Sequence, residues 1–435
     1  MSSPRVGITE DDWSNMDATQ REATGRGGGG RSDPIRILTF STLYPNEIQP
    51  SHGVFVENRL RHLVASGAVE AVVVAPVPYF PSRSSVFGRW SDYAKVPKLE
   101  RRNGLIVHHP RYPVLPAVGM TFAPAHLAAG SLRTIGRLRR SGYDFDLIDA
   151  HYVYPDGVAA TWLGMWFRKP VVVTARGTDV NYIPRFRLPR RLIQHSLARA
   201  AGIITVSQAL KKATVRLGIA PNNITVLRNG VDLERFRPLD RSQVRLKLGI
   251  SGMTLLSVGH LIERKGHDLV IEALARLTDF QLVIVGEGPA RSRLEALAQS
   301  LGVATRVRLV GTKQHDELAQ YYTAADALVL ASSREGWANV LLEAMACGTP
   351  VVASNVWGNP EVVGARAAGQ LMGERTPSGI VAAVRHLFAN LPDRDETRRY
   401  AEKFSWDETT GGQLRLFRDI LSRTRIGSDT DCLIT

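Results

Sequence analysis

Cysteine and long apolar runs are both scarce in this chain of 435 residues. Its two cysteines, Cys347 and Cys432, belong to no CxxC pair and have no histidine partner that would complete a metal site. Such sparse cysteine usage fits a reduced, cytoplasmic setting. The longest apolar stretches, such as 71–77 and 114–130, are too short or too interrupted by Pro, His and Gly to form a spanning helix of about 20 residues. We therefore expect no transmembrane segment.

Several motifs of catalysis and metal binding are also missing. HExxH, GxSxG and the P-loop do not occur. Asp144-Phe145-Asp146 matches a DxD pattern, but it precedes an expected strand instead of following one, so we interpret it as structural. The sequence therefore predicts no bound metal and no other cofactor.

Positive charge is unevenly distributed. The net charge is +14, and residues 35–220 alone carry an excess of 15 positive charges, since they hold 25 Lys and Arg against 10 Asp and Glu, whereas residues 221–435 hold 26 against 25. This asymmetry indicates either an anionic partner, such as an acidic polymer or a membrane surface, or an Arg-rich solvated face. We expect no nucleic acid partner, because the basic segments 133–140 and 185–191 belong to no groove-reading motif.

Short β-branched runs alternate with stretches of helical periodicity, which is typical of parallel sheets with crossover helices. The pattern occurs twice, with strands expected at 35–40, 71–77, 147–150, 171–174 and 202–206, and then at 254–258, 281–285, 306–310, 327–330 and 350–353. A linker is expected at 221–238, which contains Asn229-Gly230 and two prolines. We predict an α/β protein with domains at 34–220 and 239–403, and a ligand in the cleft that their strand ends face. Residues 1–33, rich in Ser, Gly, Asp and Arg and without the apolar core of a secretory signal, are expected to be a disordered tail.

The segment from Ser332 to Gly348 holds two glutamates, Glu335 and Glu343, between two expected strands. A short apolar helix is expected to follow Asn339, a good N-cap residue, and to close at Gly348. The N–H groups of Ala338, Asn339, Val340 and Leu341 would then be free to hold a diphosphate. Glu343, inside the helix, needs a hydrogen-bonding partner, which could be a ribose diol or a neighbouring backbone group.

A second candidate group directly follows the strand expected at 254–258. Here His260 and Lys265, in a loop between Gly259 and Gly266, would flank negatively charged phosphates. Gly286 and Gly288 resemble the opening of a dinucleotide fingerprint, but Arg291 takes the third glycine's place. We therefore expect a tight loop beside a nucleotide pocket.

Polar residues also follow strand ends in the first half. Gly53 begins a helix and would let backbone approach a phosphate there, or would serve a simple strand-to-helix turn. His151, Arg176 and Asp179 follow the third and fourth expected strands, so we expect them at the cleft.

Taken in order, these motifs resemble glycosyltransferase family 4, a large GT-B group that includes bacterial teichuronic acid, capsular and exopolysaccharide enzymes. The resemblance covers about residues 35–425, and the motif from Glu335 to Gly348 is its most specific part. It implies two facing Rossmann-like doubly wound domains with a deep cleft between them. It also implies that Phe404-Ser405-Trp406 starts a closing helix, 404–425, which crosses back to the first domain before a tail at 426–435.

The resemblance implies a metal-independent, retaining sugar transfer from a nucleotide-diphosphate sugar to a glycan or lipid-linked acceptor, without a protein nucleophile. Lys265 and His260 would hold the donor phosphates, Glu335 the transferred sugar and Glu343 the ribose. The sequence departs from the family pattern at His260, where Arg is usual, and at Arg176, where His is usual. Two alternatives remain open: a nucleotide-sugar-binding subunit without catalysis, and another GT-B enzyme such as a sugar-nucleotide epimerase. A peripheral position on the inner face of the plasma membrane would suit the charge of the first half.

Overall fold

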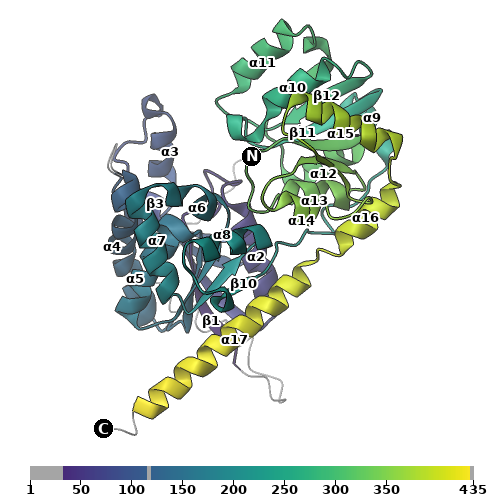
Figure 1. Ribbon diagram of the computed structural model, residues 1–435. Helices are drawn as coiled ribbons and strands as arrows, with labels where there is room; N and C mark the ends of the chain where they lie inside the picture. Colours follow the sequence, from purple (N-terminus) through teal and green to yellow (C-terminus); the bar gives the residue numbers. More distant parts are fainter. Residues whose placement is uncertain (1–32, 115–118, 432–435) are drawn as a thin grey trace. The chain divides into compact units, whose positions relative to one another are not determined.

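The computed structural model describes residues 33–114 and 119–431. The tail predicted at 1–33 therefore falls, except for Asp33, outside the described residues, as does Cys432. From Ile35 onward the chain forms one compact unit that contains two large sheets, shown in Figure 1. We call each sheet with its helices a lobe. The predicted α/β class is confirmed.

The first lobe is built on eight strands, all parallel except β4 against β5. Their order in the sheet is β10 (Ile224–Val226), β9 (Gly202–Thr205), β8 (Val171–Ala175), β7 (Leu147–His151), β1 (Ile35–Phe40), β2 (Val69–Val74), β5 (Leu105–His108) and β4 (Leu99–Arg102). The helices are α2 (Val54–Ala65), α3 (Arg89–Lys95), α4 (Gly119–Arg140), α5 (Val158–Phe167), α6 (Thr178–Asn181), α7 (Arg187–Arg199) and α8 (Gln208–Arg216). A separate pair, β3 (Val77–Pro78) and β6 (Arg111–Tyr112), lies outside this sheet.

The second lobe holds six parallel strands in the doubly wound order that Rossmann folds share. They are β13 (Val307–Leu309), β12 (Phe280–Val285), β11 (Met253–Val258), β14 (Ala327–Leu330), β15 (Val351–Ser354) and β16 (Gly369–Met372). The helices are α9 (Arg241–Leu248), α10 (His267–Leu274), α11 (Arg291–Ser300), α12 (His315–Ala324), α13 (Asn339–Ala346), α14 (Asn359–Val362), α15 (Pro377–Ala389) and α16 (Arg394–Glu402).

In each lobe the strand order reverses between two neighbouring strands, β1 and β7 in the first and β11 and β14 in the second. Ligands of doubly wound sheets bind outside the carboxyl ends of the strands at this switch point. The candidate residues follow these same strands: Gly53 after β1, His151 at the end of β7, Lys265 after β11 and Glu335 after β14. The topology therefore places the motifs where the fold binds ligands.

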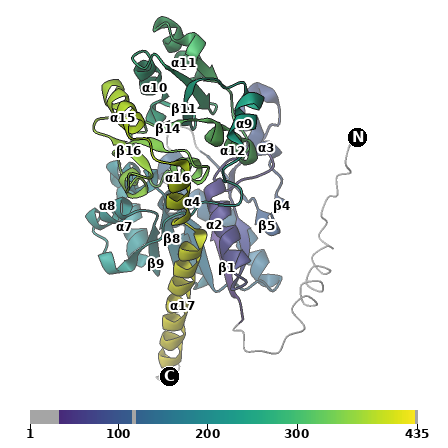
Figure 2. The ribbon, with the colours of Figure 1, turned by 90° about the vertical axis from the view of Figure 1, so that its right-hand side faces the viewer.

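Each lobe has its own apolar core, and the last helix joins the first of them. Helix α17 (Trp406–Asp431) packs against α2, as Figures 1 and 2 show, and contributes Phe417 and Ile420 to the core of the first lobe. A Cβ added at Gly202 would lie 2.9 Å from Ile420 Cδ1, so the helix lies tightly on β9. The chain thus returns to the first lobe after completing the second.

The predicted linker and the predicted C-terminal tail both contain regular structure. The expected linker at 221–238 begins with a turn, Pro221–Asn223, and β10, which is the edge strand of the first sheet. The expected tail at 426–435 continues α17 to Asp431, and the last four residues lie outside the described chain.

Candidate active site

A cleft of about 1070 Å³ is lined by loops from both lobes. The first lobe contributes the turn that holds Gly53 and the segment from Arg176 to Thr178, while the second contributes the loops after β11, β12 and β14. A Cβ added at Gly336 would lie 1.8 Å from the carbonyl oxygen of Arg176, so the backbones of the two lobes approach too closely at this point for a side chain at position 336.

Lys265 and Glu335 form the central ion pair of this cleft. Lys265 Nζ lies 2.6 Å from Glu335 Oε1, and the two side chains are only 15% and 11% exposed. Burial alone would raise the pKa of Glu335, but the charges of Lys265 and then Arg264 outweigh burial and lower it. Glu335 is therefore ionised. Its carboxylate holds the ammonium group of Lys265 where the loops after β11 and β14 meet.

Glycine geometry holds this lysine in place. Gly266, directly after Lys265, has φ +70°, and a Cβ there would lie 2.2 Å from the carbonyl oxygen of Ala331. The Lys265 side chain runs over Gly259, where an added Cβ would meet its Cε at 3.3 Å. Gly266 thus lets the loop after β11 pack against the residue that follows β14. His260 also lines the cleft.

The short helix after Glu335 begins at Asn339, but not in the way the sequence predicts. Its N-cap is Ala338, and the Asn339 side chain accepts a hydrogen bond from Asn229 Nδ2 at 3.2 Å instead of capping the helix. The predicted N-cap role of Asn339 is wrong because a tertiary partner from the first lobe competes for its side chain.

The first residues of α13 still face the cleft. Ala338, Asn339 and Val340 line it, whereas Leu341 is fully buried and its N–H donates to the carbonyl oxygen of Ala338. Leu341 therefore cannot offer the free N–H that the sequence predicts. Three residues remain at the helix start where an anion could be held.

Glu343 lies outside the cleft lining and has a side-chain partner. Tyr322 donates its hydroxyl to Glu343 Oε2 at 2.7 Å. Burial raises the pKa of Glu343 despite opposing effects that include the charge of His315. The structure thus gives Glu343 Oε2 a side-chain partner, and its predicted contact with a ribose stays a prediction.

Three of the four glycines that the sequence singles out line the cleft. Gly53, Gly259 and Gly286 line the cleft, and Gly288 does not. An added Cβ at Gly286 would lie 2.0 Å from the carbonyl oxygen of Gly259, so this tight approach needs glycine.

Of the three polar residues expected from the first lobe, only Arg176 lines the cleft. His151 is 1% exposed and lies behind it, with Nδ1 2.7 Å from an Arg176 nitrogen. Asp179 is fully buried and accepts hydrogen bonds from the backbone N–H groups of Val153, Arg176 and Gly177. These two residues shape the loop that carries Arg176.

Several lining residues were not singled out from the sequence. The basic residues among them are His52, Arg264, Lys313 and Arg334. Arg264 and Arg334 directly precede Lys265 and Glu335. Their positions inside these two motifs could have indicated that they line the cleft. Asn229 and Tyr152 come from turns whose contribution depends on tertiary packing.

Asp144 and Asp146 face away from the cleft lining, as the sequence predicts. Asp144 pairs with Lys169 and Arg139, and Asp146 accepts the backbone N–H of Arg36. Among residues 33–114 and 119–431, no group of three or more His, Cys, Asp or Glu side chains could hold a metal ion.

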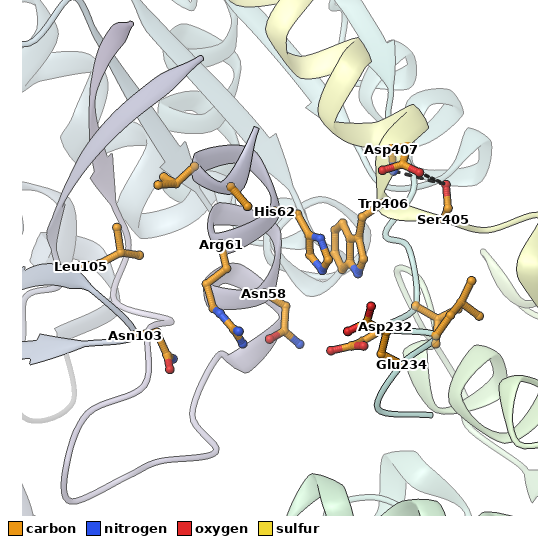
Figure 3. A pocket seen from close by; sticks show the side chains of 14 residues that line it. Asn58, Arg61, His62, Asn103, Leu105, Asp232, Glu234, Ser405, Trp406 and Asp407 are labelled. Carbon is orange, nitrogen blue, oxygen red and sulfur yellow. Dashed lines mark hydrogen bonds between the residues drawn. The ribbon is translucent and has the colours of Figure 1, made fainter. Parts of the chain in front are cut away.

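A second cavity, of about 620 Å³, lies apart from this cleft (Figure 3). It lies between α2, the segment 231–234 and the start of α17, where the chain passes between the lobes. His62 and Trp406 stack there with ring centroids 5.1 Å apart. None of the predicted site residues lines it, so we assign the chemistry to the larger cleft.

Both halves of the chain match known family models. Residues 52–235 match Glycosyltransferase Family 4, and residues 244–404 match Glycosyl transferases group 1. The chain is 30% identical over 339 residues to a teichuronic acid biosynthesis glycosyltransferase of Bacillus subtilis, across 76% of this chain and 83% of that protein. The chain belongs to glycosyltransferase family 4.

Other comparisons agree with this assignment. The glycosyltransferase is 28% identical to the D-inositol 3-phosphate glycosyltransferase of Mycobacterium tuberculosis, over 95% of this chain and 92% of that protein. Its fold resembles sucrose-phosphate synthase of Thermosynechococcus elongatus, with a TM-score of 0.73 and 20% identity over 90% of this chain and 100% of that one. Anabaena HepE in complex with UDP-glucose gives a TM-score of 0.66 and 18% identity over the same shares. The predicted GT-B fold is confirmed.

Within 33–114 and 119–431, every helix of this glycosyltransferase is too short or too polar to cross a bilayer.

Proposed function

We propose that this glycosyltransferase moves a sugar from a nucleotide-diphosphate sugar to a hydroxyl group with retained configuration and without a metal ion. The observation that carries the proposal is the Lys265–Glu335 pair, 2.6 Å apart, beside the start of α13. A lysine and a helix N-terminus together supply positive charge where a diphosphate leaves. Glu335 fixes that lysine and borders the place of the transferred sugar.

Two solved structures with a similar fold also support the proposed nucleotide-sugar donor. The Anabaena structure holds UDP-glucose, and the catalytic domain of Arabidopsis starch synthase IV holds ADP and acarbose. The chemistry then needs position and charge more than a protein nucleophile. The leaving phosphate would take the acceptor proton on the same face of the sugar, which gives retention.

The acceptor is a glycan or a lipid-linked glycan in cell-surface polysaccharide synthesis, and the protein works peripherally at the inner membrane face. Eight exposed arginines of the first lobe support this part: Arg133, Arg137, Arg139, Arg140, Arg185, Arg187, Arg190 and Arg191. They lie on α4, on α7 and just before α7. Each cation brought to an anionic bilayer contributes about 1 kcal/mol.

The test begins with calorimetric binding of UDP-, GDP- and ADP-sugars, followed by turnover with acceptor and NMR assignment of the product anomer. We expect one base to bind best and the product to keep the donor configuration. Binding without turnover would support a non-catalytic subunit, and conversion of the free donor without acceptor would support an epimerase. An inverted product would contradict the retaining mechanism.

A further inference from the structure

Arg176 is a buried cation without an ion-pair partner. Arg176 is 9% exposed and lines the cleft, and its guanidinium hydrogen-bonds only neutral acceptors: one terminal nitrogen donates to Asn229 Oδ1 at 3.1 Å, and the other to His151 Nδ1 at 2.7 Å. Its Nε has no partner among the described residues. Burial, then the charge of Arg59, lowers the pKa of Arg176 to about 9, against opposing effects of Asp149 and Asp179.

Lys265, the neighbouring cation of the cleft, does have an ion-pair partner. Lys265 has Glu335 at 2.6 Å, whereas no carboxylate of the described chain forms an ion pair with Arg176. A buried charge is costly unless it is paired, and Arg presents a planar fork suited to carboxylate and phosphate groups. The missing partner is therefore expected on a ligand.

A buried polar chain holds the guanidinium where it lies. Because arginine only donates, His151 Nδ1 must accept, which leaves the ring proton on Nε2, 3.2 Å from Asp149 Oδ2. Gln413 of α17 donates to the same oxygen at 3.0 Å and accepts from Arg59 Nε at 2.9 Å. These four residues, Arg59, Gln413, Asp149 and His151, are the buried polar chain.

The place of Arg176 separates it from the proposed diphosphate site. Lys265, His260 and the start of α13 all belong to the second lobe, whereas Arg176 belongs to the first and meets the second beside Gly336, next to Glu335. Arg176 therefore lies in the other lobe from the proposed diphosphate site, beside the loop of Glu335, which the proposed function places next to the transferred sugar.

We propose that Arg176 selects a substrate that carries an anionic group, a carboxylate or phosphate, in addition to the donor diphosphate, and that the buried polar chain positions it. This inference rests on the proposed function. The group belongs either to the transferred sugar, as in a uronic acid, or to the acceptor, as in a sugar or polyol phosphate. Asp149, His151 and Gln413 are positioning residues, since none of them lines the cleft.

The experiment measures binding of matched neutral and anionic ligands by calorimetry. The donor arm compares UDP-glucose with UDP-glucuronate, with the same pair on another base if UDP does not bind. The acceptor arm compares inositol with inositol phosphate in the presence of the nucleoside diphosphate. We expect a preference of about 10- to 100-fold for the anionic member in one arm, as a charge-assisted hydrogen bond supplies.

Arg176→Gln should reduce that preference to within about threefold, and Arg176→Lys should retain part of it, while the affinity for UDP alone stays unchanged. Arg228→Gln is the matched control, because Arg228 lies on the first-lobe side of the lobe junction, pairs with Glu361 and does not line the cleft. Gln413→Leu should weaken the preference, whereas Ile420→Val, which trims the core contact of the same helix, should not.

Each outcome decides one point. If no nucleotide binds, the proposed function fails. If nucleotide binds but the wild-type protein does not prefer the anionic member in either arm, the proposal about Arg176 fails and the proposed function stands. If Arg176→Gln weakens UDP as much as the anionic ligands, Arg176 serves the diphosphate, and the proposal is again overturned.

Discussion

Replacing Lys265 by methionine removes the ammonium group and keeps most of the side-chain length. The change leaves Glu335, 11% exposed, with Arg264 at 3.7 Å as its nearest remaining cation. Because one buried partner is lost and another cation remains, we expect the free energy of unfolding to fall by about 1–3 kcal/mol. If Lys265 also stabilises the leaving diphosphate, turnover should fall by about 10²- to 10³-fold, or about 2.7–4 kcal/mol of barrier.

The assay combines thermal unfolding with initial rates at saturating donor and acceptor. Lys169→Met is the matched control, because Lys169 is 17% exposed and pairs with Asp144 at 3.0 Å, away from the cleft. It loses the same charge and should turn over at nearly the wild-type rate. A folded Lys265→Met protein within about threefold of wild-type turnover would refute the assignment of Lys265 to the leaving group.

The Lys265–Glu335 pair also makes the stability of the protein depend on pH. The lowered pKa of Glu335 contributes stability that is present above its unfolded value and lost as pH falls through its folded value. In Lys265→Met less charge opposes burial, so the pKa of Glu335 should lie higher than in the wild type. The stability difference between the two proteins should therefore narrow as pH falls from the folded-state pKa of Glu335 in the variant to its lower value in the wild type, which urea unfolding at several pH values measures.

Three further results are expected. Turnover should survive EDTA within about twofold, whereas complete loss restored by Mn²⁺ or Mg²⁺ would contradict the metal-free proposal. Tyr322→Phe removes the hydroxyl that holds Glu343 and should weaken nucleotide binding by about 3- to 10-fold; unchanged calorimetric affinity would separate Glu343 from the nucleotide. Replacing Arg133, Arg137 and Arg140 by Gln should reduce co-sedimentation with anionic vesicles at low salt and leave nucleotide affinity intact, and equal binding of the wild type to neutral and anionic vesicles would reject the membrane surface.

Buried strands were predictable because their β-branched runs are bounded by glycines and polar turns. The observed β1 and β14 match the predicted residues, and β12 differs by one residue at its start. Two of the missed strands carry a weaker pattern: β4 reads Leu-Glu-Arg-Arg at a sheet edge, and β16, at the edge of the other sheet, begins with Gly-Gln. Edge strands are half solvated, so composition does not mark them.

Site residues close together in the sequence were easier to predict than those joined by tertiary packing. Lys265 and Glu335 follow neighbouring strands, and the doubly wound order explains their meeting. Asp149 and Gln413 are 264 positions apart, and no local pattern joins them. The neutral partners of Arg176 likewise depend on which loops the fold brings together, so its unpaired charge could not be read from the motif.

The return of α17 to the first lobe has a consequence for biosynthesis. Phe417 and Ile420 complete a core whose other members are synthesised some 190 residues or more earlier, and Gln413 bonds Arg59 within it. A domain whose core is contained in its own segment can fold while the ribosome is still translating the rest. Here Leu227 and β9 stay uncovered until the second lobe has been made and the last helix has left the exit tunnel. The core of the first lobe is therefore completed after the segment that forms the core of the second.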